Sequence, residues 1–207
     1  MQRELFEQFE EIKVVCGTDE AGRGPLAGPV VAAAVILPPD FPIEILNDSK
    51  KMNEKERGKA EIIIKERAID WAVTSISHKT IDRINILNSS LLAMKKSYEK
   101  LRDRGNEITI VLCDGNKTPD LDCSVEAIVK GDSKIPEIMA ASILAKNHRD
   151  RLMDMADEKW PQYGFSHHKG YPTKEHYNAL KEYGPCPIHR LTFRLEDKKT
   201  KREEELF

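Results

Sequence analysis

The sequence predicts an α/β protein, with one mixed sheet flanked by helices and a small helical extension at the C-terminal end. Short apolar runs of strand length alternate with longer segments that have a helical pattern. Carboxylates stand at or just after three predicted strands, where α/β folds usually build their sites. The 207 residues are 40% hydrophobic, enough for the core of one domain with an appendage. We place the domain in residues 1–160 and the appendage in residues 161–207.

Apolar runs and capping residues define the expected elements of the first half. A strand over 12–19 and a continuous apolar run over 30–37 are joined by a loop that permits antiparallel pairing. Asn53 and Glu56 form a capping-box pattern ahead of a helix over 54–68. Alternating apolar and polar residues predict a third strand over 71–76. Thr80 is expected to cap a short helix, and an apolar face predicts a longer helix over 88–104.

The second half predicts two more strands and two more helices. The strands cover 108–113 and 125–129. A long helix begins at Pro136, where proline is tolerated in the first turn, and runs to about Trp160. Thr173 is expected to cap a shorter helix that ends near Tyr183. Strands interleaved with helices in this order favour a sheet covered by helices.

Composition says more about the cellular compartment of the protein than about its function. With 33 Lys and Arg against 35 Asp and Glu, the net charge of -2 neither indicates nor excludes a nucleic-acid partner, because affinity depends on where cations cluster. The 4 cysteines form no Cys-x-x-Cys pair and no signal peptide is visible, which predicts reduced thiols and a cytoplasmic protein. The longest apolar run is too short for a membrane span, and no heptad or repeat indicates an oligomer, so we expect a monomer.

Four carboxylates are the candidates for chemistry. Asp19 and Glu20 end the first predicted strand, and Asp114 and Asp132 follow later strands. Strand ends of one sheet can lie close together, and four carboxylates suit two divalent cations, Mg²⁺ or Mn²⁺, acting on a phosphate ester. A role as an ordinary turn or cap residue remains open for each aspartate on spacing alone.

A glycine-rich loop follows the first carboxylate pair. Gly22, Gly24 and Gly28 would let a phosphate backbone come close. The spacing resembles a dinucleotide fingerprint, but Pro29 leads into an apolar strand where that fingerprint requires a helix. Zinc binding by the histidines near 167–168 and by Cys186 with His189 does not match the usual ligand spacings.

Several cations and one aromatic residue accompany these motifs. The cations could track a phosphate backbone or form a solvated surface; they include Arg23, Lys50, Lys130, Lys134, Lys146, Arg149 and Lys169. Tyr171 lies in a predicted loop, where its ring could stack on a sugar or base or could anchor the loop to the core.

Taken in chain order, these segments resemble the signature of the ribonuclease HII family, with a Lys-Gly-Asp-Ser form similar to the bacterial branch. The matching motifs extend from about residue 12 to residue 194 and include Asp19-Glu20-Ala21-Gly22-Arg23-Gly24, Asp48-Ser49-Lys50, Asp114-Gly115-Asn116, Lys130-Gly131-Asp132-Ser133, Ala145-Lys146 with Arg149-Asp150, and His168-Lys169-Gly170-Tyr171. The resemblance implies an RNase H-like fold with a helical C-terminal extension. It also implies metal-dependent hydrolysis of the RNA strand of RNA–DNA hybrids. Nicking on the 5′ side of single ribonucleotides in duplex DNA, leaving 3′-hydroxyl and 5′-phosphate ends, is implied as well.

The resemblance also implies roles for individual residues. Asp19, Glu20, Asp114 and Asp132 match the four catalytic and metal-binding carboxylates. Gly22, Arg23 and Gly24 match the loop that reads the 2′-hydroxyl, the group that separates RNA from DNA. Tyr171 matches the tyrosine that packs on the junction sugar, and the remaining expected substrate contacts are Lys50, Ser133, Lys146 and Lys169. Residues 1–160 then form the catalytic domain and residues 161–207 complete the substrate site.

Two departures from the family pattern and two alternatives accompany this interpretation. Asn147 and His148 stand before Arg149-Asp150, and Leu191 stands where a second arginine is common after Arg190. One expected phosphate contact therefore lacks its cation unless Arg194 substitutes. The related ribonuclease HIII group is disfavoured by the Gly-Arg-Gly loop. A hybrid-binding protein without catalysis is disfavoured because all four carboxylates are present.

Overall fold

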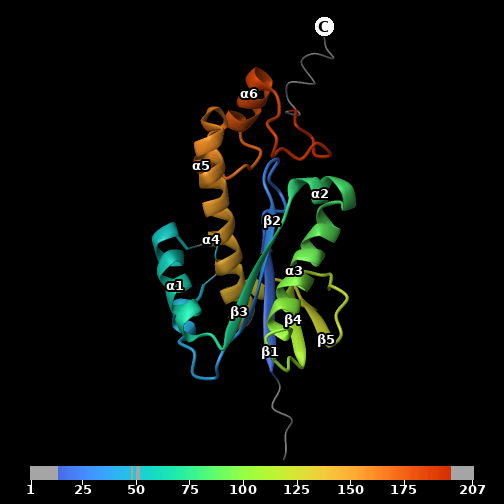
Figure 1. Ribbon diagram of the computed structural model, residues 1–207. Coiled ribbons are helices and arrows are strands. Elements are labelled where there is room, and N and C mark those ends of the chain that lie inside the picture. The colour runs from blue at the N-terminus through green and yellow to red at the C-terminus, as the bar shows by residue number, and fades with distance from the viewer. Residues whose placement is uncertain (1–13, 48, 50–51, 197–207) are drawn as a thin grey trace, which may run out of the picture.

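The computed structural model describes residues 14–47, 49 and 52–196 and is organised around one five-stranded sheet (Figure 1). The strand order is β3-β2-β1-β4-β5. The pairs β1–β2 and β2–β3 are antiparallel, whereas β1–β4 and β4–β5 are parallel, so the predicted mixed sheet is confirmed. The strands are β1 Val15–Ala21, β2 Val30–Ile36, β3 Asp70–Ile76, β4 Ile110–Asp114 and β5 Ser124–Ile128.

Helices cover both faces of the sheet, as Figure 1 shows. On one face lie α1 (Glu54–Arg67) and α4 (Pro136–Lys159), and on the other lie α2 (His78–Ile84) and α3 (Ile86–Arg102). Strand β2 is buried at every position because its alternate side chains enter two cores. Val31 and Val35 pack with residues of α1 and α4, whereas Ile36 packs with residues of α3. The continuous apolar run of this strand is therefore explained by burial on both faces.

The C-terminal part forms a small helical layer at one end of α4 (Figure 1). It contains η3 (Pro161–Tyr163), α5 (Phe165–His168) and α6 (Lys174–Tyr183). Its own core includes Phe165 and Leu180, which pack with Met153 of α4 and with Leu26 and Ala27 from the loop after β1. The extension is thus joined both to the long helix and to the glycine-rich loop.

Most predicted elements are confirmed, with shifts at several ends. The capping box of α1 is present, with Asn53 and Glu56 bonded reciprocally at 2.9 Å, and α4 begins at Pro136. Strand β1 continues to Ala21, so the carboxylate pair lies inside the strand; the prediction that the strand ends at Asp19 was wrong because Glu20 and Ala21 still pair with β2.

Two helix starts also differ from the prediction. Ser77, not Thr80, caps α2, since its hydroxyl accepts a hydrogen bond from the Thr80 amide. Helix α3 begins at Ile86 because the side chain of Asn85 caps it. The short helices η1 (Ile43–Ile45), η2 (Gly131–Ser133), η3 and α5 carry too little periodicity to be predicted. Across the described residues, no helix has both the length and the apolar character needed to cross a bilayer.

Candidate active site

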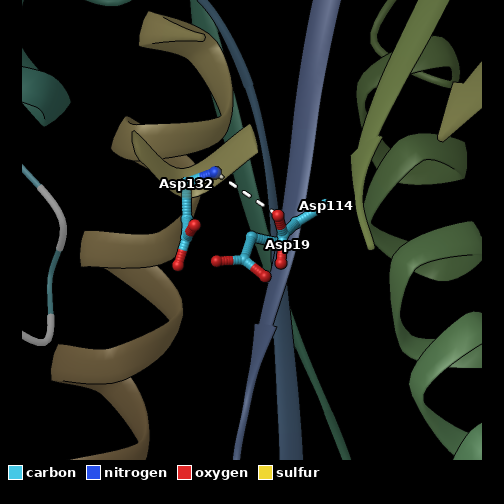
Figure 2. A group of neighbouring side chains, drawn as sticks. All are labelled: Asp19, Asp114 and Asp132. Carbon is cyan, nitrogen blue, oxygen red and sulfur yellow. Dashed lines mark hydrogen bonds between the residues drawn. The ribbon is translucent and has the colours of Figure 1, made fainter. Parts of the chain in front are cut away.

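Three of the four predicted carboxylates converge on one point (Figure 2). Asp19 comes from β1, Asp114 is the last residue of β4, and Asp132 lies in η2 after β5. Each offers one oxygen, and these oxygens all lie within 4.8 Å of one another. Asp19 and Asp114 are brought together because β1 and β4 are parallel neighbours in which Thr18 pairs with Cys113.

Backbone amides fix the third carboxylate against the second. Oδ1 of Asp114 accepts hydrogen bonds from the amides of Gly131 (2.8 Å) and Asp132 (3.3 Å). Gly131 is needed there, since a Cβ at this position would lie 2.5 Å from Cδ1 of Ile138 in α4. The turn that carries Asp132 is therefore wedged between β4 and α4.

Helix α4 closes the site from the other side by packing directly on β1. A Cβ on Gly17 would lie 2.2 Å from the carbonyl carbon of Glu137, so only glycine permits this approach. The close contact places Ser142 beside Asp19, to which its side chain is hydrogen-bonded, and Ser142 also lies 2.8 Å from the hydroxyl of Ser49. Helix α4 thus packs closely on the sheet at the site itself.

The electrostatics of the cluster favour a bound cation. Asp19 and Asp132 are buried, at 4% and 6% exposure. Burial raises the pKa of Asp19 well above its usual value, and the negative charges of Glu20 and Asp114 raise it further. Hydrogen bonds from Ser142 and from the Glu20 amide oppose this shift. Converging, partly desolvated carboxylate oxygens are the ligand type that Mg²⁺ and Mn²⁺ prefer, and a divalent cation would offset their repulsion.

Glu20 lies at the edge of this cluster rather than within it. It is not among the residues whose oxygens gather within 4.8 Å. Its Oε1 accepts a hydrogen bond from Nη1 of Arg23 at 3.3 Å, in an ion pair that links the carboxylates to the glycine-rich loop. Its effect on the pKa of Asp19 shows that the two carboxylates still interact.

Two buried arginines hold the glycine-rich loop, residues 22–29. Arg190 donates to the carbonyl oxygens of Gly22 (2.7 Å), Arg23 (3.0 Å), Gly28 (3.0 Å) and Pro29 (3.1 Å). Arg149 donates to Ala27 (3.2 Å) and Pro29 (3.1 Å). Burial lowers the pKa of Arg149 to about 10; burial and then the charge of Arg149 lower that of Arg190 to about 9. Both remain cations at neutral pH, so the loop rests on two positive charges.

The sequence interpretation missed this arrangement. Arg149 was expected among cations that either track a phosphate backbone or form a solvated surface, but it is 1% exposed and lies under Gly22, where a Cβ would be 2.2 Å from its Nε. Gly22 also has a φ of +99°, which favours glycine. Both arginines lie in segments that carry the family resemblance, but nothing local in the sequence indicates that they meet residues more than a hundred positions away.

Tyr171 faces the same loop. Its ring is 41% exposed, and its Cε1 would lie 3.5 Å from a Cβ on Gly24. The guanidinium of Arg149 lies 5.8 Å from the ring centroid. Next to Tyr171, the Gly170 carbonyl accepts a hydrogen bond from the Leu26 amide at 2.8 Å. The structure therefore brings together the loop and the tyrosine that the resemblance paired.

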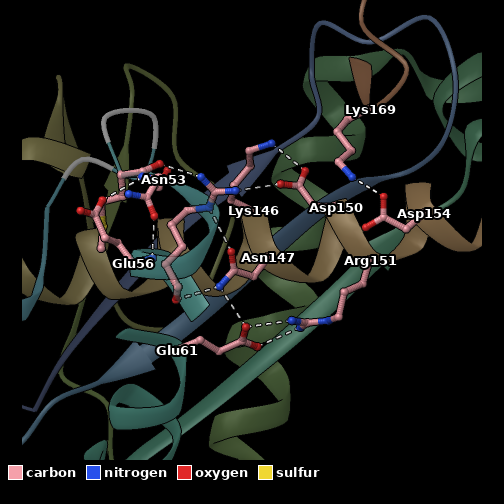
Figure 3. A network of polar contacts seen from close by, with 12 residues as sticks. Asn53, Glu56, Glu61, Lys146, Asn147, Asp150, Arg151, Asp154 and Lys169 are labelled. Carbon is pink, nitrogen blue, oxygen red and sulfur yellow. Dashed lines mark hydrogen bonds and ion pairs between the residues drawn. The ribbon is translucent and has the colours of Figure 1, made fainter. Parts of the chain in front are cut away.

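The remaining predicted substrate contacts are spread around this centre. Ser133 is exposed beside Asp132, and its hydroxyl donates to the Lys130 carbonyl. Lys146 donates to Asp150 at 2.6 Å, and Lys169 is ion-paired with Asp154, so both lysines lie along α4 (Figure 3). Lys50 lies outside the described residues.

The network in Figure 3 also explains one departure from the family pattern. The side chain of Asn147 donates to the Arg57 carbonyl (3.0 Å) and to Glu61 (2.9 Å), and accepts from Arg57 Nε (3.1 Å). Asn147 therefore docks α1 onto α4 and does not face the carboxylates. The other departure, Leu191, is 69% exposed, while the adjacent Arg190 holds the loop.

The mixed sheet, with three carboxylates converging from β1, β4 and η2, has the fold of the RNase H-like class with a candidate site for divalent cations. A family profile described as Ribonuclease HII matches residues 16–196. A Ribonuclease HII of Dechloromonas aromatica is 52% identical over 182 residues, covering 88% of this chain and 91% of that protein. One of Idiomarina loihiensis is 53% identical over 180 residues, covering 87% and 95%. The RNase HII in a PCNA:RNase HII complex from Archaeoglobus fulgidus superposes with a TM-score of 0.71 at 26% identity, covering 89% and 97%. The chain belongs to the ribonuclease HII family.

Proposed function

We propose that this enzyme, a metal-dependent ribonuclease H by its family, nicks duplex DNA on the 5′ side of single embedded ribonucleotides. It also hydrolyses the RNA strand of RNA–DNA hybrids, leaving 3′-hydroxyl and 5′-phosphate ends. The observation that carries this proposal is the direct link between the carboxylate cluster and the loop held by Arg190, through the ion pair of Glu20 with Arg23. This link supports an enzyme in which the carboxylates that cleave lie next to the loop that recognises the 2′-hydroxyl.

Asp19, Asp114 and Asp132 would hold divalent cations, with Glu20 as the fourth ligand of a two-metal site. When bound, Mg²⁺ or Mn²⁺ supplies activation of the attacking water and neutralises charge at the leaving oxygen. The protein's part is orientation: the amides of Gly131 and Asp132 fix one oxygen of Asp114, and Ser142 restrains Asp19.

Substrate recognition falls to the loop and its surroundings. Gly22, Arg23 and Gly24 read the 2′-hydroxyl, a task for which small residues leave room. Tyr171 packs on the sugar at the junction, since its ring stands exposed against Gly24. The backbone phosphates are contacted by Lys50, Ser133, Lys146 and Lys169.

The wider setting follows from the same proposal. Residues 1–160 form the catalytic domain and residues 161–207 complete the substrate site. The enzyme acts as a cytoplasmic monomer that removes ribonucleotides and RNA primers from DNA. A hybrid-binding protein without catalysis is the alternative, and the intact set of carboxylates disfavours it.

The test is cleavage of an end-labelled DNA duplex with one ribonucleotide, compared with a long RNA–DNA hybrid and an all-DNA duplex. Each is incubated with Mg²⁺, with Mn²⁺ and with chelator. We expect metal-dependent nicking of the first duplex only on the 5′ side of the ribonucleotide, cleavage of the hybrid, and no cleavage of DNA. Cleavage of the hybrid alone would contradict the role of the glycine-rich loop, and binding without any cleavage would favour the alternative.

A further inference from the structure

We propose that His176 and His189 are positioning residues that connect Tyr171 to the segment holding the glycine-rich loop, through one continuous chain of hydrogen bonds between neutral rings. This inference rests on the proposed role of Tyr171 in reading the RNA–DNA junction. It assigns a task to two buried histidine side chains that take no part in the carboxylate cluster. Both rings lie in the helical extension, away from the carboxylates.

The contacts run from one recognition element to the other. Nδ1 of His176 lies 3.0 Å from the Tyr171 carbonyl, and its Nε2 lies 3.0 Å from Nε2 of His189. Nδ1 of His189 accepts from the Cys186 amide at 2.9 Å. The two rings are 0% and 1% exposed, so water does not substitute for these partners.

Counting protons gives these contacts a single consistent arrangement. The Tyr171 carbonyl only accepts, so Nδ1 of His176 carries a proton. Nδ1 of His189 accepts from the Cys186 amide, so the proton of that ring is on Nε2, and the facing Nε2 of His176 is the acceptor. Nδ1 of His189 then carries no proton to donate to the Cys186 carbonyl, which lies at 3.2 Å. Each ring therefore carries one proton and is neutral. Burial lowers the pKa of both rings, that of His176 to about 4, which agrees with the neutral state.

The far end of the chain reaches the glycine-rich loop. His189 pairs with Ala27 in an isolated bridge, flanked by hydrogen bonds from the Gly28 amide to Ile188 and from the Arg190 amide to Leu26. The next residue, Arg190, holds the carbonyls of Gly22 and Arg23. A shift of the His189 backbone would therefore move the loop itself.

The near end of the chain holds a backbone that needs support. Lys169 and Gly170 both have positive φ values, +50° and +80°, immediately before Tyr171. A lysine in this conformation is strained and persists only where its surroundings fix it. His168 accepts from the Gly170 amide at 3.1 Å and stacks on His176 with centroids 4.6 Å apart. His168 and His176 thus hold the backbone at Gly170 and Tyr171 through hydrogen bonds.

The experiment measures steady-state cleavage of the single-ribonucleotide duplex and of a long hybrid by four proteins: wild type, His176→Asn, Tyr171→Ala and the double variant. Asparagine keeps a donor near the Tyr171 carbonyl but cannot reach His189. We expect His176→Asn to lower kcat on the single-ribonucleotide duplex by about tenfold, with a smaller change in KM and on the hybrid, because misplacement of a reacting sugar acts mainly on kcat. In the Tyr171→Ala variant, the added His176→Asn substitution should lower kcat by less than about twofold, since the two residues act as one unit.

Controls separate this inference from folding and from the proposed function. His167→Asn, whose side chain is 76% exposed on the same short helix as His168, should leave kcat unchanged. If wild type does not cut the duplex, the proposed function fails. Suppose instead that wild type cuts the duplex, that Tyr171→Ala is impaired and that His176→Asn is not. That result would refute only the hydrogen-bonded link through the histidines. The link would also be refuted if His176→Asn lowered kcat by the same factor in the Tyr171→Ala variant as in the wild type.

A spectroscopic measurement tests the chain without any variant. In ¹⁵N-labelled wild-type protein, long-range correlations between ring nitrogens and carbon-bound protons should show His176 protonated on Nδ1 and His189 on Nε2 at neutral pH. The opposite tautomers, or a charged ring at either position, would overturn the proposed arrangement.

Discussion

Asp19 is the residue at which burial, repulsion and the close approach of α4 meet. Its carboxylate is costly to keep charged without a cation, because burial and two neighbouring carboxylates raise its pKa. Residues of this kind serve function at the expense of the stability of the metal-free fold. Removing its charge should therefore separate activity from folding.

We expect Asp19→Asn to lose nearly all cleavage, by about a thousandfold or more, because a neutral amide cannot replace a carboxylate as a metal ligand. The melting temperature in chelator should be equal to or higher than that of wild type. Asp120→Asn, which changes a fully exposed carboxylate, is the matched control and should retain activity. An Asp19→Asn enzyme with near wild-type rates would remove this residue from the metal centre.

Arg190 acts through its shape as much as through its charge. One guanidinium serves four carbonyl oxygens of the glycine-rich loop, which a lysine ammonium cannot reproduce in the same plane. We expect Arg190→Lys to destabilise the protein by about 2–3 kcal/mol through unpaired buried carbonyls. It should also lower kcat/KM on the single-ribonucleotide duplex by about ten- to a hundredfold. Urea unfolding and cleavage assays measure the two effects; a fully stable, fully active variant would show that the loop holds its shape unaided.

At the scale of elements, the contact between β1 and α4 sets the width of the site. Gly17 and Gly58 form a natural pair for testing it, since a methyl group on the first would meet the backbone of α4 and one on the second would have nothing within 4 Å. We expect Gly17→Ala to destabilise by about 1–3 kcal/mol through overpacking and to reduce activity by moving α4. Gly58→Ala, in the middle of α1, should stabilise by about 0.5–1 kcal/mol. Thermal melts give the comparison, and equal effects of the two substitutions would contradict the close approach.

Elements that depend on local sequence signals could be predicted, whereas those that depend on contacts with distant residues could not. The apolar run of β2, the Asn53–Glu56 capping box and Pro136 at the start of α4 are local signals, and each element formed where it was expected. The extension of β1 to Ala21 depends on pairing with β2, which no residue of β1 reveals by itself.

The candidate site divides in the same way. Three of the four predicted carboxylates lie close together because β1 and β4 are neighbouring parallel strands and η2 follows β5; their role as metal ligands stays a prediction. The family resemblance named the glycine-rich loop and Tyr171, which lie against each other in the structure; their roles in substrate recognition stay predictions. The supporting arginines and histidines could not be inferred, because their partners are fixed only when the extension packs on α4.

For the whole molecule, two buried titratable groups make stability fall on acidification, whereas the raised pKa of Asp19 acts in the opposite direction when no metal is bound. His176 has a pKa lowered to about 4 from its usual 6.5, and Glu61 has a pKa lowered to about 2 from 4.5 because Arg151, Lys65 and Asn147 outweigh its burial. In both cases the unfolded chain binds protons more readily. The contribution of these two groups to the free energy of unfolding is thus greatest above pH 6.5 and falls on acidification, first through His176 and then, below pH 4.5, through Glu61.

We expect urea unfolding of the Asp19→Asn variant in chelator, in which the opposing contribution of Asp19 is removed, to show a loss on the order of 2 kcal/mol between pH 7 and pH 4. His176→Asn should flatten the part of this slope that lies between pH 6.5 and 4. A stability that is constant over this range would mean that His176 titrates normally and is not buried as a neutral ring.

The support of the glycine-rich loop has a consequence for how the protein is made. All three converging carboxylates lie at or before residue 132, whereas the guanidinium that fixes the loop beside them belongs to residue 190. During synthesis on the ribosome, the converging carboxylates emerge first, and the residue that holds the glycine-rich loop beside them emerges much later. The support that Arg190 gives to the loop can therefore form only after the last helical layer has been made.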